Sequence, residues 1–208
     1  MPSPADQRPF PAGAFEGRDL DLDGYHFEGT DFTGAHAEGL AFLECSLVGC
    51  ALDGAALDGS RWSECGWDRV HGVGVSLAQA TLVETRIEDS RLAAVSAWGS
   101  SWRGVTVRGG KVDWLNLRGA TLRDVSFLDC VITELDAQEA TLERVTFEGC
   151  RLVAPEFGRG RYAGVDLSGA ELCAPQGLAA LRGATLGRGQ LLGLAEELAL
   201  ELGISVAD

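Results

Sequence analysis

Acidic residues that recur every 20 positions are the part of this sequence with the clearest chemical meaning. Glu44, Glu64 and Glu84 are spaced in this way. Further acidic residues fall at related positions along the chain, namely Glu28, Asp68, Glu88, Asp89 and Asp124. Carboxylates held at a regular spacing attract a cationic surface, as the phosphates of a nucleic acid do. This chemistry requires elements that bring residues 20 apart next to one another.

The other reactive residue types form no catalytic pattern. His26, His36 and His71 have no serine or cysteine nucleophile at a recognisable spacing. The sequence contains no G-x-S-x-G motif, no Walker A loop and no dinucleotide-binding glycine motif. We therefore expect no catalytic residue, no cofactor and no metal site, and a function that depends on binding.

A period of five residues organises the chain. Every fifth position from Leu22 to Leu172 gives 31 consecutive positions without an insertion, and 27 of them are large and apolar. The exceptions are Ala37, Gly72, Ala97 and Ala137. Neither the α-helical period nor the alternation of a flat strand gives this rhythm. A fixed short repeat is typical of a solenoid, whose stacked coils bury one continuous core.

A second row of residues, two positions before each large one, is mostly small. Residues two apart share one face of an extended segment, so both rows are expected to point inward. Glycine stands two positions after the large residue in 15 of the 31 repeats. A type II turn needs a positive φ there, which glycine adopts without strain. Each repeat is therefore predicted to be a short strand followed by a corner.

This pattern resembles the pentapeptide repeat family, whose consensus is A(D/N)LXX. Residues 120–124, 140–144 and 165–169 carry the resemblance, which extends over residues 19–175. It implies an all-β solenoid, specifically a right-handed quadrilateral β-helix with four repeats per coil. The 31 repeats then make about eight coils, and a coil spacing of about 4.8 Å gives a rod roughly 37 Å long.

Residues 20 apart stack in such a coil, so the acidic residues named above are predicted to form ladders. Stacked like charges repel one another unless solvent screens them. Corners of a solenoid are polar in any case, which is the simpler interpretation of the same residues. Basic residues interrupt the acidic pattern in the middle of the chain: Arg103, Arg108, Lys111, Arg118 and Arg123.

Five of the six cysteines occupy the small inward row: Cys45, Cys50, Cys65, Cys130 and Cys150. Because no C-x-x-C pair occurs, they are interpreted as small buried hydrophobic residues. Cys173 follows a large inward position and is expected to point outward. Gly72 replaces a large core residue, which predicts a local void, a kink or an ordered water molecule.

The two ends of the chain are predicted to form caps. Residues 1–18 form an N-terminal cap containing Phe10 and Phe15, residues 19–175 form the β-helix, and residues 176–208 form a C-terminal α-helical cap. The period becomes helical from about Gln190 to Leu202. The apolar residues of this helix are candidates for a homodimer interface: Leu191, Leu194, Ala195, Leu198 and Leu202.

The chain carries a formal net charge of −14, and 11 acidic residues but only Arg8 and Arg18 occur in residues 1–60. Such a surface disfavours direct binding of nucleic acid and favours a basic partner, although it also serves solubility. The sequence has no run of apolar residues long enough for a membrane span and no signal peptide at its start. A cytoplasmic location is the default expectation.

Some pentapeptide repeat proteins are similar to B-DNA in width, handedness and charge, and they bind DNA gyrase or topoisomerase IV and protect it from quinolones. The resemblance implies a non-enzymatic DNA mimic of this kind, nearer to members whose coils are not interrupted by loops. The alternative is a scaffold or adaptor with a different protein partner. A third possibility is an ice-binding rod, suggested by the hydroxyl column Thr81, Ser101, Thr121 and Thr141.

Overall fold

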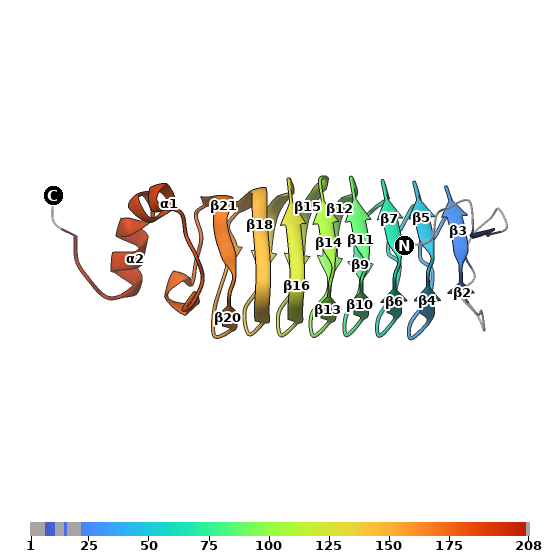
Figure 1. The fold of residues 1–208 in the computed structure, drawn as a ribbon, viewed down its shortest axis with the longest axis horizontal. Helices are drawn as coiled ribbons and strands as arrows, with labels where there is room; N and C mark the ends of the chain where they lie inside the picture. The colour runs from blue at the N-terminus through green and yellow to red at the C-terminus, as the bar shows by residue number, and fades with distance from the viewer. Residues whose placement is uncertain (1–6, 11–14, 16–21, 207–208) are drawn as a thin grey trace.

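The computed structural model describes residues 7–10, 15 and 22–206. The chain winds into a right-handed β-solenoid of about eight turns, followed by short helices at the C-terminal end (Figure 1). Each strand pairs in parallel with the strand 20 residues further along, as in the registers Leu22 to Phe42 and Phe42 to Trp62. The predicted fold class is confirmed.

Each turn has four faces, which we number in chain order from Leu22. The first face holds β2 (Leu22–Asp23), β4 (Ala41–Leu43), β6 (Arg61–Ser63), β10 (Thr81–Val83), β13 (Ser101–Arg103) and β20 (Arg161–Ala163). The second face holds β3 (Tyr25–Glu28), β5 (Ser46–Val48), β7 (Gly66–Asp68), β11 (Arg86–Glu88) and β14 (Thr106–Arg108). The third and fourth faces hold β8 (His71–Gly72), β9 (Val75–Ser76), β12 (Arg91–Ser96), β15 (Lys111–Asn116), β17 (Val131–Asp136) and β19 (Pro155–Glu156). Three strands continue from one of the first two faces around a corner: β16 (Thr121–Leu128), β18 (Thr141–Val153) and β21 (Asp166–Cys173).

The core consists of columns of side chains stacked along the rod. Phe42 and Trp62 stack with ring centroids 3.8 Å apart, and Phe127 and Phe147 stack at 4.7 Å. The five inward cysteines are buried free thiols, and burial raises the pKa of the Cys50 thiol. The thiols donate weak hydrogen bonds to carbonyls of the preceding coil. The five-residue register therefore places one large and one small side chain inside at every face.

Thirteen residues other than glycine adopt a positive φ, and each stands two positions after an inward position of the five-residue register. Glycine was expected at these corners because of its positive φ. Where another residue stands there, the hydrogen bonds between stacked coils hold it in the same conformation. The corners at Ala94, Trp114 and Glu134 differ, because these three residues do not adopt a positive φ and lie within β12, β15 and β17. A left-handed conformation costs a residue with a Cβ about 1–2 kcal/mol.

Gly72 lies close against the backbone of the preceding coil. A Cβ atom placed on Gly72 would lie only 2.8 Å from the carbonyl carbon of Leu52. The two coils therefore approach each other too closely here for a side chain at this position. A hollow on the third face is bordered by Gly72 and Leu92.

At the N-terminal end, β1 (Arg8–Pro9) pairs in parallel with β3, and Phe15 stacks on Phe32 at 4.6 Å. These contacts cover the last inward aromatic residues of the first coil. The rest of the segment predicted as the N-terminal cap, and residues 19–21, lie outside the described residues.

The C-terminal end differs from the single helix that was predicted. After a 3₁₀ turn, η2 (Leu178–Ala180), two short helices follow: α1 (Arg188–Gly193) and α2 (Ala195–Glu201). They meet at Leu194, whose side chain is buried. Gly193, a poor helix former, ends α1 and allows this turn. Gln190 donates hydrogen bonds to the carbonyls of Leu167 and Ala170, which anchors α1 to the last coil.

Candidate anionic binding surface

Glu44, Glu64 and Glu84 form a column at the corner between the first and second faces. The backbone N–H of each donates to a carbonyl of the next coil: to Ser63 at 2.9 Å, to Val83 at 3.0 Å and to Arg103 at 2.9 Å respectively. The three residues therefore stack one strand spacing apart, about 4.8 Å. All three are exposed. We call this column the glutamate ladder.

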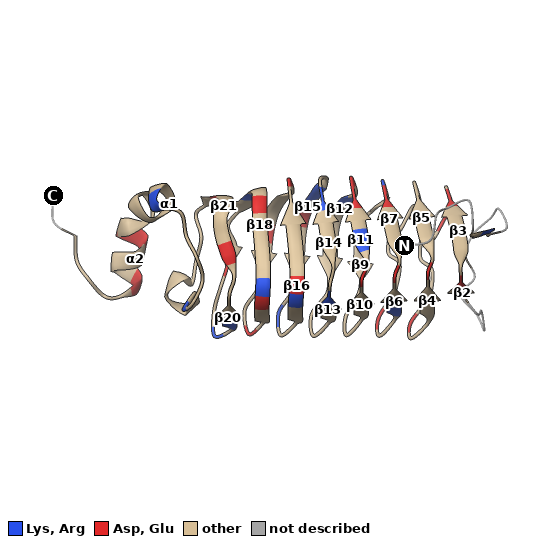
Figure 2. Ribbon diagram, viewed as in Figure 1, with Lys and Arg blue, Asp and Glu red and all other residues tan. Residues whose placement is uncertain are grey.

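The second predicted set is only partly brought together. Asp68 of β7 and Glu88 of β11 are register partners on the second face. Glu28 lies two coils before Asp68, with Val48 between them. Asp89 stands at the next corner with a φ of 48°. Acidic residues therefore follow one edge of the second face as the glutamate ladder, whereas its other edge is interrupted by Val48 and Arg69, and Figure 2 shows red, tan and blue segments there.

Asp124 does not belong to the ladder. Gly104 separates it from Glu84 in the column, and Arg144 of the next coil donates to both of its carboxylate oxygens, at 2.6 and 2.9 Å. This paired hydrogen bond lowers the pKa of Asp124 and raises the pKa of Arg144. The charge of Asp124 is thus neutralised within the rod, which the sequence pattern did not reveal.

The ladder carboxylates stand in a conformation that favours glycine. The φ values of Glu44, Glu64 and Glu84 are 52°, 55° and 48°. Glycine occupies the same column at Gly24, Gly104 and Gly164 with φ values of 66°, 65° and 65°. A glycine would therefore fit each ladder position without the strain that the glutamates bear. Folding alone does not favour glutamate at these three corners.

Charge divides the rod into two parts. Residues 22–90, the acidic half, hold 12 Asp and Glu against three Arg, whereas residues 91–175, the balanced half, hold 11 against ten Lys and Arg. In the balanced half, Arg side chains reach carboxylates of neighbouring coils, as in Arg123 to Glu143 at 3.1 Å. Among the described residues of the acidic half, the one ion pair formed by an Arg is Arg69 with Asp68. The acidic half therefore presents most of its carboxylates without a cationic neighbour.

One histidine does meet a serine, which sequence reasoning missed. His26 Nδ1 lies 2.6 Å from Ser46 Oγ, and the Ser46 hydroxyl donates to Gln7. Because that proton is directed to Gln7, His26 is placed to donate to Ser46, opposite to the role of a general base. Ser46 is also buried. The contact fixes the N-terminal segment to β3 and β5, and the signal for it was the stacking of residues 26 and 46.

The predicted dimer residues divide into two groups. Leu191, Ala195 and Leu202 are exposed, whereas Leu194 is buried and Leu198 is half-buried. The helical segment exposes further apolar side chains: Leu192, Leu200, Ile204 and Val206. Within the described chain, no cluster of three His, Cys, Asp or Glu side chains is placed to hold a metal ion. No helix in the described ranges has the length and apolar character needed to cross a membrane.

Residues 113–149 match the family model for pentapeptide repeats, described as eight copies. This part of the chain is therefore similar to the pentapeptide repeats of that family. Among curated proteins no match was found for the chain.

Solved structures similar to this chain include a trypsin-treated variant of QnrB1, a plasmid-mediated fluoroquinolone resistance protein. It is 19% identical, with a TM-score of 0.38, over 94% of this chain and 98% of that one. Full-length QnrB1 is 17% identical, with a TM-score of 0.32, over 89% and 99%. HetL from Nostoc sp. strain PCC 7120 is 15% identical, with a TM-score of 0.33, over 79% and 90%. At these values the likeness supports no conclusion about a partner or an activity.

Proposed function

We propose that the acidic half binds the cationic DNA-binding groove of a type II topoisomerase such as DNA gyrase, in place of duplex DNA. Binding there would modulate the enzyme or protect it from topoisomerase poisons. The observation that carries this proposal is the glutamate ladder, whose carboxylates stack at strand spacing without cationic partners in the described chain.

The charge density of the acidic half supports the proposal. Its 69 residues make about three and a half coils, or roughly 17 Å of rod at strand spacing. A net charge of −9 over that length is about one charge per 1.8 Å, close to the value of about 1.7 Å for duplex DNA. The balanced half carries a net charge of −1 over a longer stretch. A groove that recognises phosphates by their charge should therefore bind the acidic half in preference to the balanced half.

Backbone strain gives a second line of support. Glu44, Glu64 and Glu84 hold a conformation that costs free energy, while glycine at the same corner would remove that cost. Strained residues that folding does not require are found at functional sites. Ten further residues other than glycine share a positive φ, so the strain supports the proposal only in combination with the unpaired charge of the ladder.

The test replaces the ladder by glycine, as Glu44→Gly, Glu64→Gly and Glu84→Gly in one chain. Glycine is native to this column, so the rod should remain folded by circular dichroism. Competition with duplex DNA for gyrase should weaken at least tenfold, and the remaining binding should depend less steeply on salt. Gln79→Gly is the matched control, because Gln79 has the same left-handed conformation, with a φ of 56°, and no charge.

Two results would contradict the proposal. One is gyrase supercoiling that a large excess of the native protein leaves unchanged, with no change in sensitivity to poisons. The other is equal loss of gyrase binding in the Gln79→Gly control. With no effect on gyrase, a scaffold with another basic protein partner becomes the better interpretation of the same acidic half.

We further propose that two rods pair through the C-terminal helices. The exposed side chains of Leu191, Ala195 and Leu202, with their apolar neighbours, form the contact, and Leu198 lies at its edge. Leu194 is already buried within the chain itself, so it stabilises the cap and takes no part in the contact between rods. Sedimentation of the full chain and of a chain ending at Leu186 tests this, since monomers in both samples mean that the helices serve as a cap alone.

A further inference from the structure

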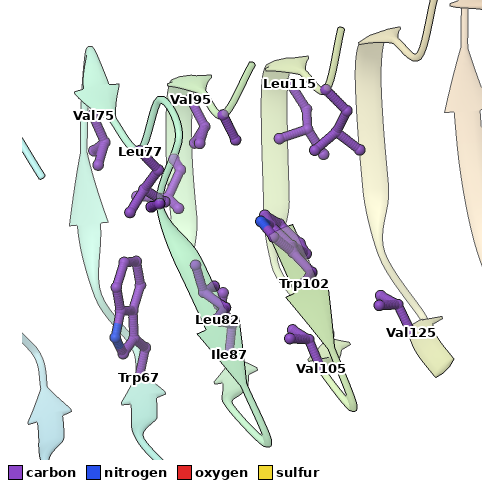
Figure 3. Close-up of a cluster of buried hydrophobic side chains, with 14 of the residues drawn as sticks. Trp67, Val75, Leu77, Leu82, Ile87, Val95, Trp102, Val105, Leu115 and Val125 are labelled. Carbon is purple, nitrogen blue, oxygen red and sulfur yellow. The ribbon is translucent and has the colours of Figure 1, made fainter. Parts of the chain in front are cut away.

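Helix α2 stands at the end of the rod with much of its apolar surface turned away from the coils. The rod buries its apolar side chains, and Figure 3 shows Leu77, Leu82 and Leu115 inside it. In α2, by contrast, Leu200 is 70% exposed, and Leu202, directly after the helix, is 66% exposed. A helix that served only to cover the open coil would turn these leucines toward it.

The residue between these two leucines faces the rod instead. The Glu201 carboxylate accepts hydrogen bonds from the backbone N–H groups of Leu178, at 3.0 Å, and of Ala179, at 2.7 Å. These groups begin η2, and its N-cap residue, Gly177, makes no side-chain hydrogen bond to them. The first N–H groups of a helical turn have no partner within the turn. Glu201 therefore supplies from α2 the acceptors that η2 lacks.

The start of η2 is in turn fixed to the last coil. Gln176 N donates to the carbonyl of Pro155 at 2.9 Å, and Phe157 N donates to the carbonyl of Gln176 at 2.8 Å. Gly177 lies close against the same coil, since a Cβ there would be 1.2 Å from the carbonyl oxygen of Phe157. The N–H groups that hold the carboxylate therefore belong to the end of the rod, and α2 is tied to it.

The position of Glu201 within α2 disfavours a carboxylate. A helix carries a partial positive charge at its N-terminal end and a partial negative charge at its C-terminal end. Glu196 and Glu197, in the first turn of α2, are therefore placed favourably, whereas Glu201 is the last residue of the helix. The helix alone gives no reason for an acid there, but the two hydrogen bonds to η2 do.

Three residues define the side of α2 that faces the rod. Leu194 is buried, Leu198 is half-buried, and Glu201 is bonded to η2. Their spacing of four and then three residues places them on one side of the helix. No residue of α2 itself is buried, so apolar packing alone holds the helix weakly. The Glu201 hydrogen bonds therefore fix the rotation of α2 about its axis, which decides where Leu200 and Leu202 point.

We propose that Glu201 is the positioning residue of the contact between rods. This inference rests on the pairing of rods proposed above. With its carboxylate on η2, α2 holds Leu200 and Leu202 outward, toward a second copy of the chain. Without these hydrogen bonds, α2 is free to rotate and to cover the leucines against its own rod, which removes them from the contact.

The test compares two variants with the same change of charge, Glu201→Gln and Glu197→Gln, by sedimentation equilibrium. Both remove one negative charge from α2, but Glu197 forms no side-chain hydrogen bond or ion pair with any described residue. Glu201→Gln should raise the dissociation constant of the dimer about fivefold, because its hydrogen bonds lose the charge of the acceptor. Glu197→Gln should leave the constant unchanged, or lower it slightly because two acidic helices then repel each other less.

Glu201→Ala and hydrogen exchange give a second measurement. Alanine removes both acceptors, so it should weaken pairing more than glutamine, which keeps one acceptor oxygen. The amides of Leu178 and Ala179 should exchange faster in both Glu201 variants and not in Glu197→Gln. Circular dichroism should show an intact rod in every variant, since Glu201 is exposed and lies outside the coils.

Weaker pairing and faster exchange confined to the Glu201 variants support the proposal. A native chain that is monomeric at every concentration overturns the pairing of rods, and the role of Glu201 with it. If the native chain pairs and Glu201→Gln pairs equally well, the pairing stands and the positioning role is overturned. Equal weakening in Glu197→Gln also overturns that role, because the effect then belongs to charge. Unchanged amide exchange in Glu201→Ala overturns the carboxylate as the anchor of α2.

Discussion

Residues 22–90 and residues 91–175 wind through the same four-sided coil, but their carboxylates have different surroundings. In the balanced half, Asp124 is held by Arg144, and Glu143 by Arg123. In the acidic half, the same corner column holds Glu44, Glu64 and Glu84, which form no ion pair with an Arg or Lys of the described chain. The inward residues do not follow this division, since both halves contain stacked aromatic pairs.

The difference shows that the fold and the surface charge of this rod are independent. Parallel ladder bonds and inward columns fix the coil, whatever side chain stands at a corner. The outward positions can therefore vary without disturbing the coil. In the acidic half they give the rod a charge density near that of DNA. The predictions below test this separation, beginning with the largest expected effect.

Core substitutions should lower the free energy of unfolding by the same amount in both halves. Phe42→Ala and Phe127→Ala each remove a buried, stacked ring, and each should lower the free energy of unfolding by about 3–5 kcal/mol. Urea denaturation measures both. A much smaller loss for Phe42 would mean that the acidic half is packed less well, and the two halves would then differ in more than charge.

Gly72→Ala tests the close approach of two coils near the border of the two halves. The added Cβ would meet the Leu52 backbone at 2.8 Å, so the coil must shift and stability should fall by about 1–3 kcal/mol. Denaturation midpoints of the variant and the native chain provide the measurement. A gain in stability would show that the backbone is regular here and that the missing side chain leaves usable space.

The coil was predictable from the sequence because apolar residues recur at every fifth position, in one register, over 31 positions. The stacking of Glu44, Glu64 and Glu84 followed from the same register. What could not be predicted depends on side-chain reach and local backbone. The pairing of Arg144 with Asp124 depends on rotamers, and the break at Leu194 depends on whether a leucine turns inward or outward.

The backbone at Gly110 was also beyond sequence reasoning. Glycines two positions after a large residue were expected at corners, and Gly109 is one of them. Gly110, however, stands in the small inward row, where cysteine, serine and alanine are usual. Its left-handed φ and the partial exposure of Val107 and Val112 depend on how neighbouring coils pack. A five-residue sequence pattern carries no information about that packing.

The paired carboxylate of the balanced half should show a pH-dependent effect. Arg144 lowers the pKa of Asp124, so the ionised pair stabilises the fold above the ordinary aspartate pKa. Asp124→Asn should therefore lower the unfolding midpoint slightly at about pH 7, and the difference should vanish as pH falls through the lowered pKa of Asp124. A difference that persists once the pH is below the lowered pKa of Asp124 would assign the effect to packing, since Asp124 is then protonated.

The smallest expected effect is the change in stability when a glutamate is replaced by glutamine. This change should have opposite signs in the two halves. Glu64 lies between Glu44 and Glu84, so Glu64→Gln removes two repulsive neighbours and should raise stability, by no more than about 0.5 kcal/mol. Salt screens that repulsion, so the gain should shrink as ionic strength rises. Glu143→Gln, which breaks the 3.1 Å contact with Arg123, should lower stability by a similar amount under the same conditions. Urea denaturation at low and high salt compares the two variants. If Glu64→Gln also lowers stability at low salt, the ladder carboxylates have favourable contacts within the rod, and the argument that they are held there for a partner loses its basis.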